Sequence, residues 1–504
     1  MPFPLPAPLK DPSTLFYQSN VVKRSIIASY WTVILLAVPL WWYATSIQRL
    51  SLPISQIHSH AQRHLKLPVD ICVEDVDAVS NLHAFFAEKT RAGSDGWSDL
   101  EVRVHGGSEC ADTSSYRVRN APNILVTQNE IYLPLHDKQR LSSASEIFTS
   151  LVNPSSRTIN QNNRVVQYSP QYRLAFTLLN EDASTGSSAS NWDIQAGLAQ
   201  RVKPILDKLQ PLHNFTIESQ VQYHGRLAFK PQAIGDVSYG LTAEDLTVFI
   251  NSAEWSLSSS ASNDPVLHFV LFIPSATRRP LHILTSDAQI SRSKSFLLPQ
   301  WGGITIYNPP IDILGKNADL PARVNDQVFQ EFSRQLLTLL GVPFLPNGVQ
   351  THQSDISSLS DWQIDALMRR RALENAKGAH ETLTSIVKLV DQIENMPVKE
   401  DVKGDVQGAL DALEKVSPSL HSLPFRLLTN DPQTFAASSL QDTFRYSAEA
   451  TTLASRAFFN PGMLALLYFP AEHKYAVYTP LFASAVIPLF VAALKEITAW
   501  RKQR

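Results

Sequence analysis

The residues most suited to chemistry lie in one short segment, His105-Gly106-Gly107-Ser108-Glu109-Cys110. A cysteine nucleophile needs a histidine base nearby, and folds that use this pair usually supply the two residues from loops far apart in sequence. Here the two residues are only five positions apart, and the flanking pattern of a catalytic cysteine is missing. The carboxylates are scattered, and no nucleophile-elbow, P-loop or zinc-peptidase sequence is present. The sequence therefore predicts no catalytic residue.

A group of histidines offers a second kind of chemistry, because His60 and His64 would share one face of a helix. Two histidines at this spacing can bind a metal if a third ligand joins them. No carboxylate or cysteine stands at helical spacing to complete the set, so we interpret the histidines as a solvated polar face. We expect neither a metal nor another cofactor.

Composition excludes further classes of function. The 504 residues carry a formal net charge of -2, so no global field favours nucleic acid. Two cysteines, Cys72 and Cys110, exclude a disulfide-dense scaffold. The two residues could pair in an oxidising lumen or remain separate buried thiols, and the sequence leaves both alternatives open.

Two uncharged apolar segments, Ser25 to Ile47 and Tyr475 to Leu494, are the candidate membrane anchors of the chain. Each is long enough to span a bilayer, and Trp41 to Tyr43 forms an aromatic belt at the end of the first. A cleaved signal peptide is the competing interpretation of the first span, because Ala44-Thr45-Ser46 resembles a cleavage site. Its length and its distance from Met1 favour a retained span.

Charge around the second span predicts the topology. Four basic residues follow that span, namely Lys495, Arg501, Lys502 and Arg504. The positive-inside rule therefore places both termini in the cytosol and the long middle region in a lumen. The one acceptable sequon, Asn214-Phe215-Thr216, falls in that region and predicts glycosylation of Asn214.

The middle region divides where the hydrophobic period changes. Residues 48–320 alternate short strands with helical stretches, which predicts an α/β domain with a mixed sheet. Residues 321–474 have helical periodicity and predict a bundle, with an apolar interfacial segment at 457–470. The full expectation is a cytosolic tail (1–24), a transmembrane helix (25–47), the two luminal regions, a second transmembrane helix (475–494) and a cytosolic tail (495–504).

Individual strands and helices can be placed along this region. The predicted strands include Val69 to Val73, Leu100 to His105, Tyr116 to Val126, Ile131 to Leu135, Phe215 to Tyr223, Val266 to Ile273 and Leu281 to Leu284. Val165 to Leu179 is predicted to be one strand or a hairpin broken near Pro170. A further strand begins at Gly302-Gly303, where paired glycines let another segment approach closely. The predicted helices are Trp192 to Leu209, Leu241 to Ile250, a stripe from Phe329 to Leu340, most of Asp361 to Val416, and Ser438 to Phe458.

Several short motifs, in order along the chain, resemble the PIG-S family of glycosylphosphatidylinositol (GPI) transamidase subunits. They are Val38-Pro39-Leu40-Trp41-Trp42, Arg49, Leu52-Pro53, His213-Asn214-Phe215-Thr216 to Gln220, Asn251-Ser252-Ala253-Glu254-Trp255, Trp301-Gly302-Gly303-Ile304, Gln335-Leu336-Leu337 to Gly341, Asp361-Trp362-Gln363 to Arg371, Leu467-Tyr468-Phe469-Pro470 to His473-Lys474, and Val477-Tyr478-Thr479-Pro480-Leu481. Each match is weak alone, and together they cover nearly the whole chain.

The resemblance implies a noncatalytic scaffold subunit of an endoplasmic reticulum complex that attaches preassembled GPI anchors to proprotein C-termini. The implied partners are the other subunits, including the one with Cys-His peptidase chemistry, together with membrane lipid, and the proprotein and GPI lipid through the complex. Lys23 and Arg24 stand where they could contact an anionic lipid headgroup, or they are plain topology determinants. A membrane-anchored luminal hydrolase and a glycolipid- or peptide-binding receptor remain alternatives.

Overall fold

The computed structural model describes most of the chain. The described residues are 19–45, 49–61, 65–91, 97–107, 116–135, 146–153, 164–184, 186, 188–235, 238–251, 254–257, 262–310, 317–346, 349–351, 359–393, 396–416, 440–464 and 471–503. They form two compact units. One unit comprises Met1–Ser59, His380–Leu410 and Thr452–Arg504, and the other comprises His60–Ala379 and Asp411–Thr451.

The second unit begins with a six-stranded mixed sheet of order β14-β4-β5-β3-β1-β2. Its strands are β1 (Leu67–Val73), β2 (Leu100–Gly106), β3 (Tyr116–Asn120), β4 (Leu125–Val126), β5 (Glu130–Leu133) and β14 (Gln350–Thr351). All neighbours are parallel except β4 and β5. The helix α3 (Val76–Arg91) packs on β1 and β2 and contributes Leu82 and Phe86 to the core.

A five-stranded sheet of order β12-β13-β10-β6-β7 follows. Its strands are β6 (Gln171–Asn180), β7 (Asn214–Gln222), β10 (Val266–Ile273), β12 (Ser295–Leu298) and β13 (Gly302–Ile306). Only β12 runs antiparallel to its neighbour. The central strands β6 and β10 are buried on both faces, which explains their nearly continuous apolar sequences.

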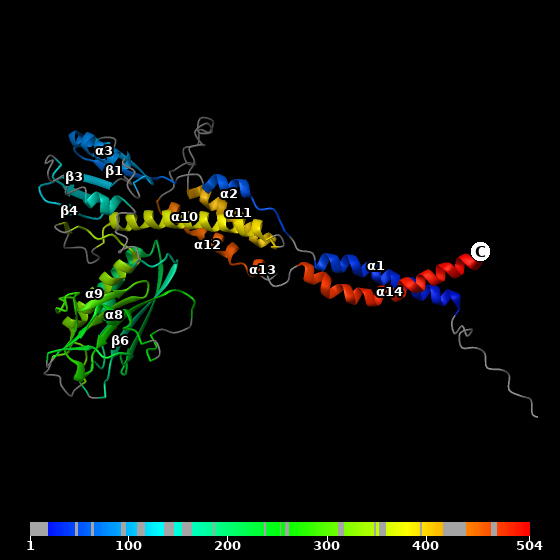
Figure 1. The fold of residues 1–504 in the computed structure, drawn as a ribbon. Helices are drawn as coiled ribbons and strands as arrows, with labels where there is room; N and C mark the ends of the chain where they lie inside the picture. Colours follow the sequence, from blue (N-terminus) through cyan, green and yellow to red (C-terminus); the bar gives the residue numbers. More distant parts are fainter. Residues whose placement is uncertain are drawn as a thin grey trace, which may run out of the picture. The chain divides into compact units, whose positions relative to one another are not determined.

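Different elements cover the two faces of this sheet. Helices α6 (Ile194–Gly197), α7 (Lys203–Leu209) and α9 (Ala322–Leu340), with a π-helical turn at Leu198–Val202, contribute to the core on one face. Figure 1 shows α9 beside the strands around β6. The core on the other face includes side chains of β9 (Ser238–Leu241) and β11 (Leu281–Ile283), which form a small sheet with β8 (Gln232–Ile234), and of the helix α8 (Ala243–Thr247).

The glycine pair permits the close approach that the sequence predicted. A Cβ on Gly303 would lie 2.1 Å from Gln335 Oε1 of α9, and one on Gly302 would lie 2.0 Å from the His268 carbonyl oxygen. The His268 contact is with the backbone, so only glycine at position 302 lets β10 lie this close to β13; at position 303 a side chain would require the Gln335 amide to shift.

The long helix α10 (Asp361–Gln392) joins the cores of both large sheets. Trp362 is fully buried and stacks on Tyr116 of β3, with ring centroids 3.8 Å apart. Arg369 donates to Tyr116 Oη at 2.9 Å and to the Leu151 carbonyl at 3.0 Å. Arg371 donates to the carbonyls of Val166 and Leu340, at 2.9 and 3.0 Å. The start of α10 is therefore part of the α/β core.

Besides α10, the region predicted to form a helical bundle contains α11 (Glu400–Val416) and α12 (Leu440–Phe458). In the second unit, Thr451 of α12 donates to the Asn375 carbonyl of α10 at 2.7 Å. In the first unit, Arg456 of α12 forms an ion pair with Asp405 of α11. The first unit also contains the start of α2 (Ile54–Ala61), the turn α13 (Pro461–Leu464), and the end helices α1 (Asn20–Thr45) and α14 (Ala471–Gln503).

Some of the strand and helix boundaries predicted from the sequence were wrong. Tyr116 to Val126 is not one strand, because the chain turns after Asn120 and returns as β4. The segment before β6 is irregular at residues 166–170, so Pro170 ends a loop rather than splitting a hairpin. The helix expected over Leu241 to Ile250 spans only Ala243–Thr247, because Leu241 ends β9 and Thr242 caps the helix.

Candidate functional site

The end helices α1 and α14 are the first candidate site. Each contains a stretch long and apolar enough to cross a membrane, Val21–Tyr43 in α1 and Tyr475–Thr498 in α14. These stretches overlap the predicted spans, and their large apolar side chains, such as Val33 and Leu36, are exposed. Apolar surface of this extent requires lipid or protein around it.

Contacts near both ends hold the two helices together in antiparallel fashion (Figure 1). Toward the C-terminal end of α1, the Trp41 ring lies edge-on against Tyr478 and Phe482, with centroids 5.4 and 5.1 Å away. At the other end, Lys23 Nζ lies 3.3 Å and Arg24 Nε 2.7 Å from the Glu496 carboxylate. The start of α1 therefore meets the end of α14.

The sequence singled out Lys23 and Arg24 as possible lipid contacts, and the structure brings them together on Glu496. Their side chains stay about half exposed, so the ion cluster does not cover them. Sequence reasoning missed Glu496. The available signal was that Glu496 is the only acidic residue between Tyr475 and the end of the chain.

Asn214 is the first residue of β7, an edge strand of the five-stranded sheet. Its side chain is exposed, and so is Thr216 two residues later. Its backbone N–H donates to the Pro170 carbonyl at 2.8 Å, which fixes the start of the strand. The sequon therefore lies on an accessible sheet edge.

The residues considered for Cys-His and metal chemistry either have partners in the fold or fall outside the described residues. Cys72 on β1 is disulfide-bonded, and Cys110 lies outside the described residues. His105 Nε2 is 3.6 Å from Asp70 Oδ1 on the neighbouring strand. His64 is also outside the described residues. Within the described ranges, no group of three or more His, Cys, Asp or Glu side chains could hold a metal ion.

Two histidines that the sequence analysis did not consider for chemistry, His213 and His268, are buried and neutral. His213 donates from Nδ1 to the Ser169 carbonyl at 2.7 Å, and burial lowers the pKa of its imidazole to about 4. His268 stacks on Trp301 with centroids 4.6 Å apart, and burial lowers its pKa to about 4 as well. Both rings are therefore part of the folded core, and protonation of either ring would destabilise the fold because it would bury a charge.

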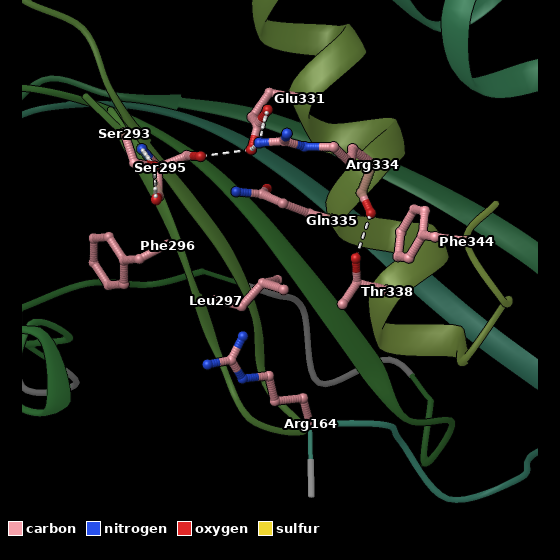
Figure 2. Close-up of a pocket in the computed structure, with 10 residues that line it drawn as sticks. All are labelled: Arg164, Ser293, Ser295, Phe296, Leu297, Glu331, Arg334, Gln335, Thr338 and Phe344. Carbon is pink, nitrogen blue, oxygen red and sulfur yellow. Dashed lines mark hydrogen bonds and ion pairs between the residues drawn. The ribbon is translucent and has the colours of Figure 1, made fainter. Parts of the chain in front are cut away.

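The second candidate site is a groove between α9 and the edge strand β12. Two adjoining pockets of about 430 and 300 Å³ form it, and they share Ser293, Ser295, Glu331 and Arg334. Figure 2 shows one wall made by α9 side chains and the opposite wall made by residues of β12 and the segment before it. We call this feature the α9 groove. The rest of its lining comprises Arg164, Arg292, Lys294, Phe296, Leu297, Thr305, Ile306, Tyr307, Val324, Gln327, Val328, Gln335, Thr338 and Phe344.

The floor of the α9 groove is polar and its rim is basic. Glu331 accepts from Arg334 Nη2 at 2.8 Å and from the Ser295 hydroxyl. Gln335 is only 3% exposed; its Nε2 donates to the Ile304 carbonyl at 3.4 Å, while its Oε1 has no partner among the described residues. The described lining residues offer hydroxyl, amide and charged groups that can bind a polar ligand.

Paired apolar end helices and mixed α/β sheets define this chain as a membrane-anchored α/β protein. The sequence pattern of the family described as "PIG-S: Phosphatidylinositol-glycan biosynthesis class S protein" matches residues 28–92 and 113–503. The chain therefore belongs to the PIG-S family, as its motifs indicated.

Relatives from distant organisms agree with this assignment. A rat protein named "GPI-anchor transamidase component PIGS" is 28% identical over 95% of this chain and 96% of its own length. A fission yeast protein (Schizosaccharomyces pombe) named "GPI transamidase component PIG-S homolog" is 29% identical over 96% of this chain and 85% of its own length. A human protein, also named "GPI-anchor transamidase component PIGS", is 33% identical over 69% of this chain and 61% of its own length.

Proposed function

We propose that this chain is a noncatalytic scaffold subunit of the endoplasmic reticulum GPI transamidase complex. The observation that carries the proposal is the family match over nearly the whole chain, since the relatives are named as components of that transamidase. In this role the chain supports the attachment of preassembled GPI anchors to the C-termini of proproteins. It contacts proprotein and GPI lipid through the assembled complex.

The noncatalytic part of the proposal has separate support in the contacts of the chemistry-bearing side chains. The Cys72 sulfur is engaged in a disulfide and so cannot act as a thiolate. The polar side chains of the α9 groove bond to one another. We assign the Cys-His peptidase chemistry to a partner subunit, as the family resemblance implies.

The proposed topology has both termini in the cytosol and the sheets and bundle in the lumen. Residues 1–24 and 495–504 are cytosolic, 25–47 and 475–494 span the membrane, and 48–320 and 321–474 are luminal. The antiparallel contacts of α1 with α14 support two crossings, and the basic C-terminal residues support the direction. The segment 457–470 is proposed to lie at the luminal interface. Its last residues, 465–470, fall outside the described part of the chain.

Purification in mild detergent tests the scaffold role. The tagged full-length chain should copurify with other membrane proteins and with transamidation activity. The chain freed of its partners should cleave no proprotein. Cleavage by the partner-free chain would contradict a noncatalytic role, and purification as a single polypeptide would contradict a scaffold.

Glycosylation of Asn214 tests the topology independently. In the proposed orientation, endoglycosidase treatment shifts the wild-type chain on a gel, and both Asn214→Gln and Thr216→Ala abolish the shift. Protection of an epitope tag at the C-terminus in intact microsomes would place that end in the lumen and overturn the orientation.

A further inference from the structure

We propose that the α9 groove binds an extended, acidic segment of a partner polypeptide. This inference rests on the proposed scaffold function and adds the chemistry and conformation of a bound partner. Three features of the groove carry it: its unbalanced charge, its length, and the strand edge along one side.

The charge of the groove favours an anionic occupant. Among the described residues that line the two pockets, four side chains are basic, namely Arg164, Arg292, Lys294 and Arg334, and one is a carboxylate, that of Glu331. Glu331 is already bonded to Arg334 and to the Ser295 hydroxyl. Arg164, Arg292 and Lys294 are exposed and have no ion pair in the described part of the chain. A partner that brings carboxylates would complete these contacts.

The length of the groove suits an extended chain better than a small molecule. Its wall follows α9 from Val324 to Thr338. Fourteen helical steps correspond to about 21 Å, which an extended segment of about six residues would cover. Phe344 lies at the far end with 47% of its surface exposed, and it offers an apolar contact for an anchoring side chain.

The strand edge offers backbone hydrogen bonds to such a segment. Ile306 N–H donates to the Lys294 carbonyl, so the alternation of an antiparallel pair directs the backbone of Ser295 and Leu297 away from β13. The Ser293 hydroxyl already bonds both backbone groups of Ser295. Leu297, which lines the groove, is left with outward N–H and C=O groups that have no partner among the described residues. An added strand can pair there, and the basic rim selects its acidic side chains.

Site-specific photocross-linking in the assembled complex tests the proposal. The photoreactive amino acid p-benzoylphenylalanine replaces Phe344 in the full-length chain, and Val248, which is 57% exposed and does not line the groove, is the control position. We expect the Phe344 position to give one cross-linked segment of negative net charge, belonging to a copurifying polypeptide. Mass spectrometry of the cross-linked peptide identifies the segment.

Charge reversal then tests why the segment binds. The combined variant Arg164→Glu, Arg292→Glu and Lys294→Glu should reduce the cross-link about tenfold, as expected when three exposed charge contacts become repulsive. The matched variant Lys203→Glu, Lys230→Glu and Lys377→Glu reverses three exposed lysines outside the groove and should leave the yield unchanged. If the groove variant unfolds, a salt series on the wild-type complex replaces it, and the yield should fall steeply between about 0.05 and 0.5 M salt.

The outcomes separate this inference from the scaffold proposal. A cross-link to lipid alone, to a neutral or basic segment, or with equal yield at Val248 overturns the inference. The same holds if no cross-link forms while the chain still copurifies with its partners, in which case the scaffold role stands. A chain that copurifies with no other polypeptide refutes the scaffold role itself.

Discussion

The buried imidazole of His213 predicts that the fold loses stability on mild acidification. In the folded chain its Nδ1–H is bonded to the Ser169 carbonyl, and its Nε2 is buried without a partner among the described residues. A proton added at Nε2 would have no acceptor, and the nearby charge of Arg371 further lowers the pKa. The unfolded chain accepts that proton near pH 6.5 and the folded chain only near pH 4.

The size of the effect follows from these two pKa values. Between pH 6.5 and pH 4 the unfolded state binds more protons than the folded state, so the free energy of unfolding falls as pH falls. For His213 alone, linkage gives a loss of about 2 kcal/mol between pH 7 and pH 5 and about 3 kcal/mol by pH 4. The stability that the neutral His213 ring contributes is fully present only above pH 6.5.

Urea unfolding of the full-length chain in detergent, followed by tryptophan fluorescence, measures this loss. His213→Gln keeps a donor for Ser169 and removes the titrating ring, so comparison with the wild type removes the effect of every other titrating group. We expect the wild type to lose about 2 kcal/mol more than the variant between pH 7 and pH 5. Parallel pH profiles for the two proteins would show that His213 titrates normally in the folded chain and would refute the reasoning.

Three other changes have defined outcomes. Trp362→Ala should lower the free energy of unfolding by about 3–5 kcal/mol in the same assay, because it empties a fully buried site, and Trp362→Phe should cost less. Gly303→Ala should cost about 1–3 kcal/mol through its clash with Gln335, and added Gln335→Ala should relieve part of that cost in a double-mutant cycle. Glu496→Lys should lower recovery of the complex about threefold, because the new lysine repels Lys23 and Arg24 at the start of α1. Adding Lys23→Glu should restore part of the recovery. Equal recovery of the wild type, the single variant and the double variant would contradict a role for this ion cluster.

Much of the fold could be predicted because, in many segments, the spacing of apolar residues along the sequence matches the face that is buried in the structure. The stripe of Phe329, Phe332, Leu336 and Leu340 predicted α9, and those side chains pack in the core beside the five-stranded sheet. The apolar run Val266 to Ile273 predicted a buried strand, and it is β10. In both segments, local pattern and tertiary packing require the same secondary structure.

Other elements depended on long-range packing that a local pattern does not contain. Trp192 to Leu209 has one helical period, yet a π-helical turn interrupts it at Leu198–Val202. This turn lies where α9 packs closely: a Cβ on Gly197 would lie 2.2 Å from the Phe329 ring. The helix α3 was not predicted, although Leu82 and Phe86 are buried in the core.

The candidate sites were harder to predict for the same reason. The α9 groove combines Arg164, residues 292–297 and residues of α9, so its charge is visible only after folding. Lys23 and Arg24 were visible as basic residues, but their partner Glu496 lies 473 and 472 positions away. Sequence spacing cannot relate residues at such a separation, whereas the antiparallel contact of two helices places them side by side.

That contact also bears on topology more strongly than the charge count at either span. The start of α1 lies against the end of α14, and Trp41 of α1 meets Tyr478 near the start of the apolar stretch of α14. If both helices cross a bilayer, these contacts put the two chain ends on one side and the region between the helices on the other. The basic residues around the first span are nearly balanced, so they decide little alone. If the helices are paired in this way, the excess of basic residues that follows Leu494 predicts one orientation for both spans, and Lys23 and Arg24 lie on the same side as that excess.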